Sequence, residues 1–152
     1  DDSYPATSIT ELVAEEIRIV RQLEDGLELV SSYVQGEEEI QRIEFEYTND
    51  RRLAVREEYR GDDVYTEKYR YGSDGGLLEK RELTNNQLQQ RSVYAPFGQE
   101  AGAVTAPEST TSFIELFSEG DLVLRVYYNE QKRLLEQVIQ QGEVLRERHF
   151  ED

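Results

Sequence analysis

The sequence predicts an all-β protein: an antiparallel up-and-down meander of about ten to twelve strands, either an open curved sheet or a barrel. Turn-forming residues recur about every dozen positions, and the segments between them alternate apolar or aromatic with charged residues, as consecutive β-hairpins do. Ten tyrosines and five phenylalanines fall largely inside these segments, which favours a folded sheet over a disordered acidic chain. The turn signals are Asp25-Gly26, Gly36, Asn49-Asp50, Gly61-Asp62, Asp74-Gly75, Asn85-Asn86, Gly98, Glu119-Gly120, Asn129-Glu130 and Gln141-Gly142.

The N-terminal segment predicts a short helix before the first strand. Ser8 and Glu11 have the spacing of a capping box, and apolar residues follow at helical spacing, so a helix is expected over about residues 8–16. From Ile17 the sequence alternates instead. Asp25-Gly26 then predicts a type I′ turn, because both residues tolerate a positive φ.

The middle of the chain predicts strands with one apolar and one charged face. Residues 43–47 alternate aliphatic and aromatic side chains with glutamates, and residues 53–60 and 65–71 follow the same rule. The alternation fades over residues 99–111, where small residues and Pro107 predict a loop. Strands are expected again from Phe113, and residues 144–150 are expected to form the last one.

Composition limits the partners that this chain can bind. It has 152 residues, with 17 basic and 33 acidic side chains and a formal net charge of −16. Such a surface repels phosphate backbones and anionic lipid headgroups, so neither nucleic acid nor direct membrane insertion is expected. The apolar runs are far shorter than the roughly 20 residues of a membrane-spanning helix. The length fits one domain over residues 8–152, preceded by a polar tether over residues 1–7.

The absence of methionine and cysteine bears on processing and location. A chain without methionine is expected to be a processed or trimmed product, and a removed signal peptide would explain it. The sequence is therefore expected to be extracytoplasmic, in the periplasm or at the cell surface, with a lipid anchor on the preceding segment as one form of the tether. The lack of cysteine excludes disulfides and thiolate metal sites without fixing the compartment.

Three segments of the chain align with one another. Residues 45–53, 69–77 and 126–134 each have an aromatic end, a polar turn and a returning leucine. This pattern resembles the tyrosine-and-aspartate hairpin repeats of the Rhs/YD-repeat superfamily and, more distantly, the MORN-like hairpins of small bacterial proteins. The resemblance implies a sheet or spiral of hairpins that serves as a wall or an adhesive surface, and it implies no catalytic residues.

Two sets of residues are candidates for binding. The tyrosines could form a platform on which a sugar or peptide stacks, or they could be the apolar layer of the sheet. They are Tyr65, Tyr69, Tyr71, Tyr94, Tyr127 and Tyr128. Arg60, Gly61 and Asp62 match an integrin-type adhesion tripeptide, although Gly61 and Asp62 are also what a tight turn prefers.

The sequence offers no constellation for catalysis, a cofactor or a metal. His149 is the only histidine, and its place near an acidic end predicts exposure to solvent. The acidic runs at residues 37–39 and 62–63 lack the spaced ligands of a calcium loop, and residues 72–76 lack the lysine of a phosphate loop. A non-enzymatic protein without a cofactor is therefore expected.

These observations predict a non-enzymatic, exported β-hairpin repeat module with a binding or structural role at a bacterial cell envelope. A sheet face or the loop at residues 99–111 would bind an unknown protein or another envelope component. The alternative is a barrel-like or cupped carrier of a small hydrophobic ligand, with tyrosines and leucines lining the cavity and the N-terminal helix as a lid.

Overall fold

The computed structural model describes residues 7–14 and 16–150, and in these residues it is an antiparallel β-meander with one short 3₁₀ helix. Of the predicted tether, residues 1–6 lie outside the described residues, and the Thr7 carbonyl accepts a hydrogen bond from the Leu23 amide. The elements are β1 (Ser8–Ala14), β2 (Ile17–Glu24), β3 (Leu27–Gln35), β4 (Glu38–Tyr47), β5 (Leu53–Arg60), β6 (Asp63–Tyr71), β7 (Leu77–Thr84), β8 (Gln87–Tyr94), η1 (Ala101–Thr105), β9 (Ser112–Ser118), β10 (Asp121–Asn129), β11 (Lys132–Gln140) and β12 (Glu143–His149).

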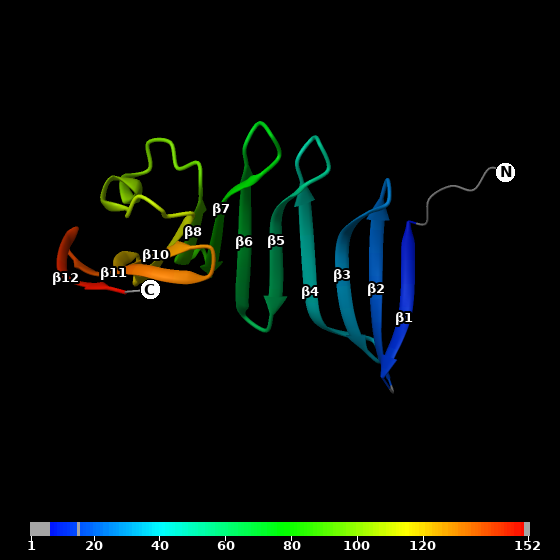
Figure 1. The fold of residues 1–152 in the computed structure, drawn as a ribbon. Coiled ribbons are helices and arrows are strands. Elements are labelled where there is room, and N and C mark those ends of the chain that lie inside the picture. The colour runs from blue at the N-terminus through cyan, green and yellow to red at the C-terminus, as the bar shows by residue number, and fades with distance from the viewer. Residues whose placement is uncertain (1–6, 15, 151–152) are drawn as a thin grey trace. The chain divides into compact units, whose positions relative to one another are not determined.

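The order of the strands in the sheet is their order in the chain (Figure 1). This confirms the predicted up-and-down meander, and the number of strands is twelve among the described residues. A barrel would require the first and last strands to pair. In this protein β1 and β12 are the two ends of the strand order, so the sheet is open and the barrel form of the carrier alternative is wrong.

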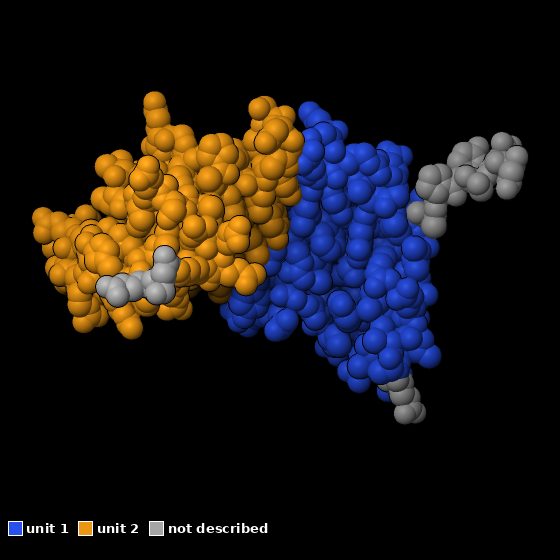
Figure 2. Space-filling model, viewed as in Figure 1, with its two compact units in different colours: residues 1–67 blue, residues 68–152 orange. Residues whose placement is uncertain are grey.

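The chain divides into two compact units, residues 1–67 and residues 68–152, and the boundary falls within β6 (Figure 2). We call them unit 1 and unit 2 and describe each by itself. The expectation of one cooperative domain over residues 8–152 concerns unfolding rather than compactness, and it stays a prediction.

The short turns depend on residues in the left-handed region of φ and ψ. Asp25 and Gly26 have φ values of 51° and 80°, as a type I′ turn requires, which confirms the predicted first hairpin. Gln141 and Gly142 repeat this geometry with φ values of 51° and 80°. The turn residues therefore match the right-handed twist of the strands on either side of them.

Two of the three aligned segments share a longer turn. The Thr48 amide donates to the Arg52 carbonyl at 2.8 Å, and the Gly72 amide donates to the Gly76 carbonyl at the same distance. The fourth residue of each turn has a positive φ, 67° in the first and 87° in the second. The third segment turns over two residues between β10 and β11 instead. The internal similarity thus extends to backbone geometry in the first two segments only.

The predicted N-terminal helix is wrong, because its residues form strand β1. Ile9 lies opposite Arg21 and Glu11 lies opposite Ile19 in an antiparallel ladder with β2. Without the ladder, the edge of β2 would have unpaired backbone groups, and β1 supplies their partners. A capping box stabilises only one end of a helix whose nucleation is unfavourable, so the tertiary pairing decides the outcome.

The expectation of one apolar and one charged face fails in the β4–β5 hairpin. Next to the turn, Tyr47 of β4 lies opposite Leu53 of β5, so the apolar side chains of the two strands share a face there. A register shift follows between Glu46 and Tyr47, beyond which Phe45 lies opposite Arg56. A shift of one residue moves every following side chain to the other face of its strand. The bulge therefore mixes apolar and charged side chains on each face.

The core of unit 1 is small and partly polar. Ile19 and Ile43 are buried, and Ser31, which lies opposite Ile43 in the sheet, is buried as well. The Tyr47 hydroxyl donates to the Glu28 carbonyl at 2.7 Å and so joins β4 to β3. Burial and the nearby Glu28 carboxylate raise the pKa of Tyr47, which keeps the hydroxyl a donor.

We expect Tyr47→Phe to lower the free energy of unfolding by about 1 kcal/mol, because the Glu28 carbonyl loses its side-chain donor. Urea denaturation followed by circular dichroism measures this difference. Tyr33→Phe is the matched control, since the Tyr33 hydroxyl has no hydrogen-bond partner in the described part of the chain. Equal effects of the two substitutions would show that the Tyr47 bond does not stabilise the β3–β4 pairing.

Candidate functional site

One face of unit 2 has a row of apolar side chains across four strands. Val93, Phe113, Tyr127 and Leu135 are direct cross-strand neighbours from β8 to β11, and each is at most 3% exposed. The Phe113 ring lies 5.5 Å from the Tyr127 ring, centroid to centroid. We call this face of unit 2 the loop face, because the connection between β8 and β9 covers it.

The β8–β9 loop, residues 95–111, packs on this row. Phe97 and Ala106 are half-buried against it, and the Phe97 and Phe113 ring centroids are 5.4 Å apart. The segment predicted as a loop is therefore a packed layer that contains η1. Its most exposed large apolar side chain is Val104, at 85%.

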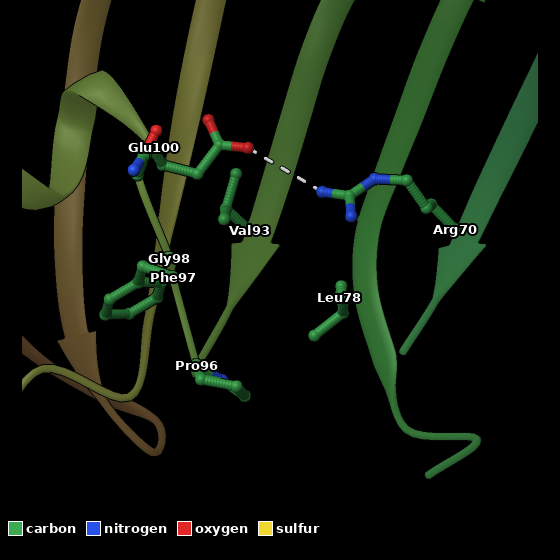
Figure 3. Close-up of a pocket in the computed structure, with 8 residues that line it drawn as sticks. Arg70, Leu78, Val93, Pro96, Phe97, Gly98 and Glu100 are labelled. Carbon is green, nitrogen blue, oxygen red and sulfur yellow. Dashed lines mark ion pairs between the residues drawn. The ribbon is translucent and has the colours of Figure 1, made fainter. Parts of the chain in front are cut away.

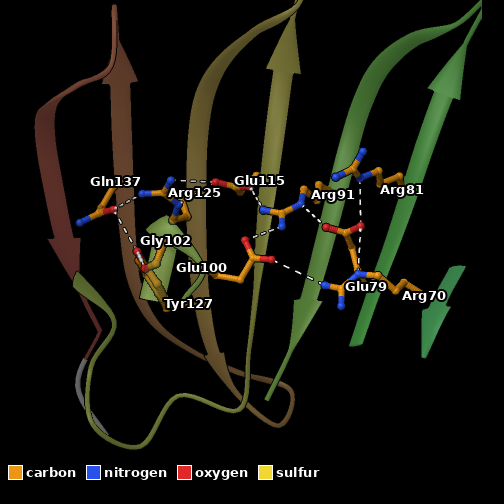
Figure 4. Close-up of polar contacts among 10 residues, drawn as sticks. All are labelled: Arg70, Glu79, Arg81, Arg91, Glu100, Gly102, Glu115, Arg125, Tyr127 and Gln137. Atoms are coloured by element: carbon orange, nitrogen blue, oxygen red, sulfur yellow. Dashed lines mark hydrogen bonds and ion pairs between the residues drawn. The ribbon is translucent and has the colours of Figure 1, made fainter. Parts of the chain in front are cut away.

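A second row on the loop face consists of charged and polar residues. Arg91, Glu115, Arg125 and Gln137 are also direct cross-strand neighbours, and they are largely buried. The Arg91 guanidinium donates to carboxylates of Glu79 at 2.6 Å, Glu115 at 2.8 Å and Glu100 at 2.5 Å (Figure 4). Because Glu100 belongs to the β8–β9 loop, this arginine ties the loop to three strands.

Arg125 extends the row towards β11. Its guanidinium donates twice to Glu115, at 2.7 and 3.0 Å, and once to the Gln137 side chain at 3.4 Å. It also lies 6.0 Å from the centre of the Phe113 ring, within the range of a cation–π contact. The buried charges of this row are thus compensated by partners on neighbouring strands.

A second attachment of the loop runs through Tyr127. Its hydroxyl donates to the Gly102 carbonyl at 2.5 Å and lies 2.7 Å from the Thr105 hydroxyl. Gly102 is buried so tightly that a Cβ atom there would meet the Phe113 ring at 2.7 Å. This close approach of η1 to the sheet requires glycine for space, not for its backbone freedom.

The arginines also favour the ionised form of the buried Glu79 carboxylate. Burial acts to raise the pKa of Glu79, but hydrogen bonds and Coulombic attraction from Arg91 and Arg81 outweigh it, so the pKa is lowered. Burial likewise opposes the charge on Arg91, yet its three carboxylate partners raise the pKa of the guanidinium. Glu79 and Arg91 therefore remain ionised at neutral pH.

A pocket of about 400 Å³ lies beside this cluster on the loop face (Figure 3). Its apolar wall is made by Leu78 from β7, Val93 from β8 and the loop residues Pro96 and Phe97, and Arg70 of β6 lies across from them. The remaining lining residues are Gly98, Gln99 and Glu100.

The opposite face of unit 2 has a groove of about 340 Å³. Tyr94 and Tyr128 both lie opposite Ser112 in their ladders, so the two rings flank the same central strand. We call this the tyrosine groove; it is lined by Ser92, Tyr94, Ser112, Ile114, Tyr128, Glu130 and Gln131. Neither tyrosine hydroxyl has a hydrogen-bond partner among the described residues.

The six candidate tyrosines therefore do not form one platform. Tyr127 is 0% exposed and holds the loop, so it is a core residue. Tyr69 and Tyr71 are half-buried in β6 and do not line the tyrosine groove, while Tyr65 belongs to unit 1 and is 37% exposed. Tyr94 and Tyr128 are brought together across Ser112, because the β8–β9–β10 register aligns them.

The candidate adhesion tripeptide lies at the β5–β6 turn. Gly61 and Asp62 form the turn with a φ of 61° at Gly61, and both are exposed. The Arg60 guanidinium donates to Glu58 at 3.2 Å and lies 5.9 Å from the Tyr65 ring centre. This geometry agrees with the turn interpretation, and adhesion stays a prediction.

The other candidate residues are exposed or have structural partners. His149 lies at the end of β12 with its side chain 70% exposed and 3.4 Å from Glu147. Residues 37–39 and 62–63 are exposed at turns and strand ends. Within residues 7–14 and 16–150, no group of three or more histidine, cysteine, aspartate or glutamate side chains could hold a metal ion. The same residues contain no helix long and apolar enough to cross a membrane.

The sequence interpretation missed the buried charge cluster. A signal was present, because Arg91, Glu115 and Arg125 each stand two residues from a large apolar side chain and therefore on the same face of their strands. A charged residue at a position where the alternation expects an apolar one indicates a buried ion pair. The strand register is needed to identify its partner.

Comparison with protein-family models finds no family that matches this chain, and comparison with curated proteins finds no matching relative.

We expect Arg91→Gln to lower the free energy of unfolding at neutral pH by about 3 kcal/mol, because three carboxylates lose their common partner in a largely buried site. Urea denaturation measures this. Arg133→Gln is the control: Arg133 donates to Glu136 at 3.0 Å with its side chain 55% exposed, and its loss should cost about 0.5 kcal/mol.

The stability of Arg91→Gln relative to the native protein is also expected to depend on pH. A lowered pKa in the folded state stabilises above the ordinary glutamate pKa, and this contribution is lost as the pH falls through the folded pKa. Without Arg91, burial acts on the Glu79 carboxylate with less compensation, so the pKa of Glu79 rises. The difference in unfolding free energy between Arg91→Gln and the native protein should therefore narrow as the pH falls towards about 4. A constant difference across this range would contradict the assignment.

We expect Gly102→Ala to destabilise unit 2 by about 1 to 3 kcal/mol, because the added methyl group would collide with the Phe113 ring. Thermal unfolding gives the change in Tm, and amide hydrogen exchange should show faster exchange in the β8–β9 loop. Val104→Ala is the control in the same 3₁₀ helix, where an exposed side chain should change stability by less than about 0.5 kcal/mol.

Proposed function

We propose that this protein is a non-enzymatic binding module of a bacterial cell envelope, and that its binding surface is the tyrosine groove. The occupant would be an extended segment of a partner protein in which apolar side chains alternate with basic ones. The observation that supports this is the pairing of Tyr94 and Tyr128 on either side of Ser112, on the face that the β8–β9 loop does not cover.

The groove has the features of a peptide-binding surface. Aromatic side chains give large contact area with little loss of side-chain entropy, and their free hydroxyls can bond to a peptide backbone. Ile114 adds an aliphatic side chain to the lining next to Ser112, since it stands two residues from Ser112 on the same face of the strand. The rings are supported by a strand that is paired on both sides, which favours a preformed surface.

Charge supports the choice of occupant. Glu130 is the only charged residue among those that line the groove, and it is exposed at the β10–β11 turn. The whole chain has a net charge of −16, so basic segments are attracted and acidic ones repelled during association. A segment with apolar and basic residues therefore matches both the walls and the rim.

The envelope location rests on the resemblance to bacterial hairpin-repeat proteins and on the exported character expected from the sequence. It is tested separately, by fractionating cells that produce the full-length protein with a C-terminal epitope tag. Recovery in the cytosolic fraction would contradict the envelope location and would leave the binding proposal unaffected.

We expect a labelled peptide that alternates lysine and leucine to bind at physiological ionic strength, and Glu130→Lys to weaken its binding about tenfold through charge reversal. Fluorescence anisotropy measures the affinity, and nuclear magnetic resonance shifts should centre on Tyr94, Ser112 and Tyr128. Glu119→Lys is a closely matched control, because Glu119 is also an exposed turn glutamate with a positive φ, 51° against 55° at Glu130.

A peptide of equal charge that alternates lysine and serine separates specific docking from general attraction. It should bind much more weakly, because it lacks the apolar side chains that would contact the rings. Equal affinity for the two peptides, or an equal loss of affinity in the Glu119→Lys and Glu130→Lys variants, would show that the groove is not the binding surface.

A further inference from the structure

The pocket on the loop face contains an arginine whose donors are largely unused. The Arg70 side chain is 53% exposed, and its nearest carboxylate oxygens are those of Glu100 at 3.6 Å and Glu79 at 3.9 Å. Both distances exceed that of a hydrogen bond. A guanidinium offers five donors in a planar fork, so Arg70 can accept a further anionic partner without breaking a short bond.

The two neighbouring glutamates already have closer partners. Glu79 lies 2.6 Å from Arg91 and 3.0 Å from Arg81, and Glu100 lies 2.5 Å from Arg91. With Arg125, the cluster holds four arginines against three glutamates, in a chain whose overall charge is strongly negative. Arg70 is the arginine of this cluster with the longest ion pairs, and of the four arginines it is the one that lines the pocket, together with Glu100.

Apart from Arg70 and the Glu100 carboxylate that faces it, the pocket has an apolar wall. Leu78, Val93, Pro96 and Phe97 line it, as Figure 3 shows, and the volume of about 400 Å³ is in the range of small-molecule sites. Apolar walls with one well-placed charged group bind ligands that have an apolar body and one charged end. Arginine recognises a carboxylate with two parallel hydrogen bonds, which fixes the orientation of the ligand.

We propose that this pocket binds a carboxylate joined to a short apolar group, with Arg70 donating to both carboxylate oxygens and the apolar group lying against Leu78 and Phe97. A singly charged carboxylate fits better than a phosphate, because the nearby Glu79 and Glu100 disfavour a second negative charge. The same chemistry is found in free organic acids and at the C-terminus of a peptide that ends in an apolar residue.

The pocket is distinct from the tyrosine groove. Val93 lines the pocket, whereas its chain neighbours Ser92 and Tyr94 line the groove, and successive residues of a strand face opposite sides of the sheet. The two proposals therefore fail independently.

The test uses 3-phenylpropanoate, its neutral amide, and a short peptide ending in leucine with either a free or an amidated C-terminus. Nuclear magnetic resonance titration of the full chain should give saturable shifts at Leu78, Val93 and Gln99 with a Kd on the order of 1 mM for at least one of the two carboxylates. Binding of 3-phenylpropanoate would indicate a free organic acid as the ligand, and binding of the peptide with a free C-terminus would indicate a peptide C-terminus. The amides should bind at least about tenfold more weakly, because they lack the charge that Arg70 recognises.

Arg70→Gln should weaken binding about tenfold or more, while Arg81→Gln should leave it within about twofold. The two arginines are closely matched, since both pair with Glu79 and are about half exposed, at 53% and 48%, but only Arg70 lines the pocket. Arg70→Lys should restore part of the affinity. Absence of saturable shifts for both carboxylates, equal binding of acid and amide, or equal loss in both glutamine variants would overturn the proposal.

Discussion

The structure of unit 2 depends on the compensation of buried negative charge by Arg91. Three carboxylates converge on this guanidinium, two from strands on either side of β8 and one from the β8–β9 loop. Ionised glutamates at such depth would be strongly destabilising alone. Because one planar cation satisfies all three, the same interaction fixes the pairing of β7, β8 and β9 and the position of the loop that covers them.

The fixed loop gives the two faces of unit 2 different chemistry. On the loop face, Phe97 and Ala106 close the apolar row, and Arg70 remains beside a pocket with spare donors. On the opposite face, which the β8–β9 loop does not cover, Tyr94 and Tyr128 line an open groove. Both candidate sites therefore follow from the side of the sheet on which the network holds the loop.

This chain has many charged and few apolar side chains, and its core includes polar side chains as well as apolar ones. Buried polar groups recur on the sheet, among them Ser31 in unit 1 and Glu115 and Gln137 in unit 2. Cross-strand pairing places donors beside acceptors in unit 2, so Glu115 and Gln137 are stabilised by partners instead of by exclusion of water alone. Burial in this fold is therefore as much a matter of register as of hydrophobicity.

The sequence by itself determined the strands, the turns and the meander order. These are local properties: alternation fixes extended segments, and pairs such as Asp25-Gly26 fix where the chain reverses. Only the tertiary structure decided that β1 is a strand, that the sheet stays open, and which residues lie across from one another. A one-residue bulge such as that at Tyr47 changes the face of every side chain beyond it, and no local pattern encodes that shift. The candidate sites depend on cross-strand partners and on a packed loop, so Tyr94, Tyr128 and Arg70 acquired their roles from the register.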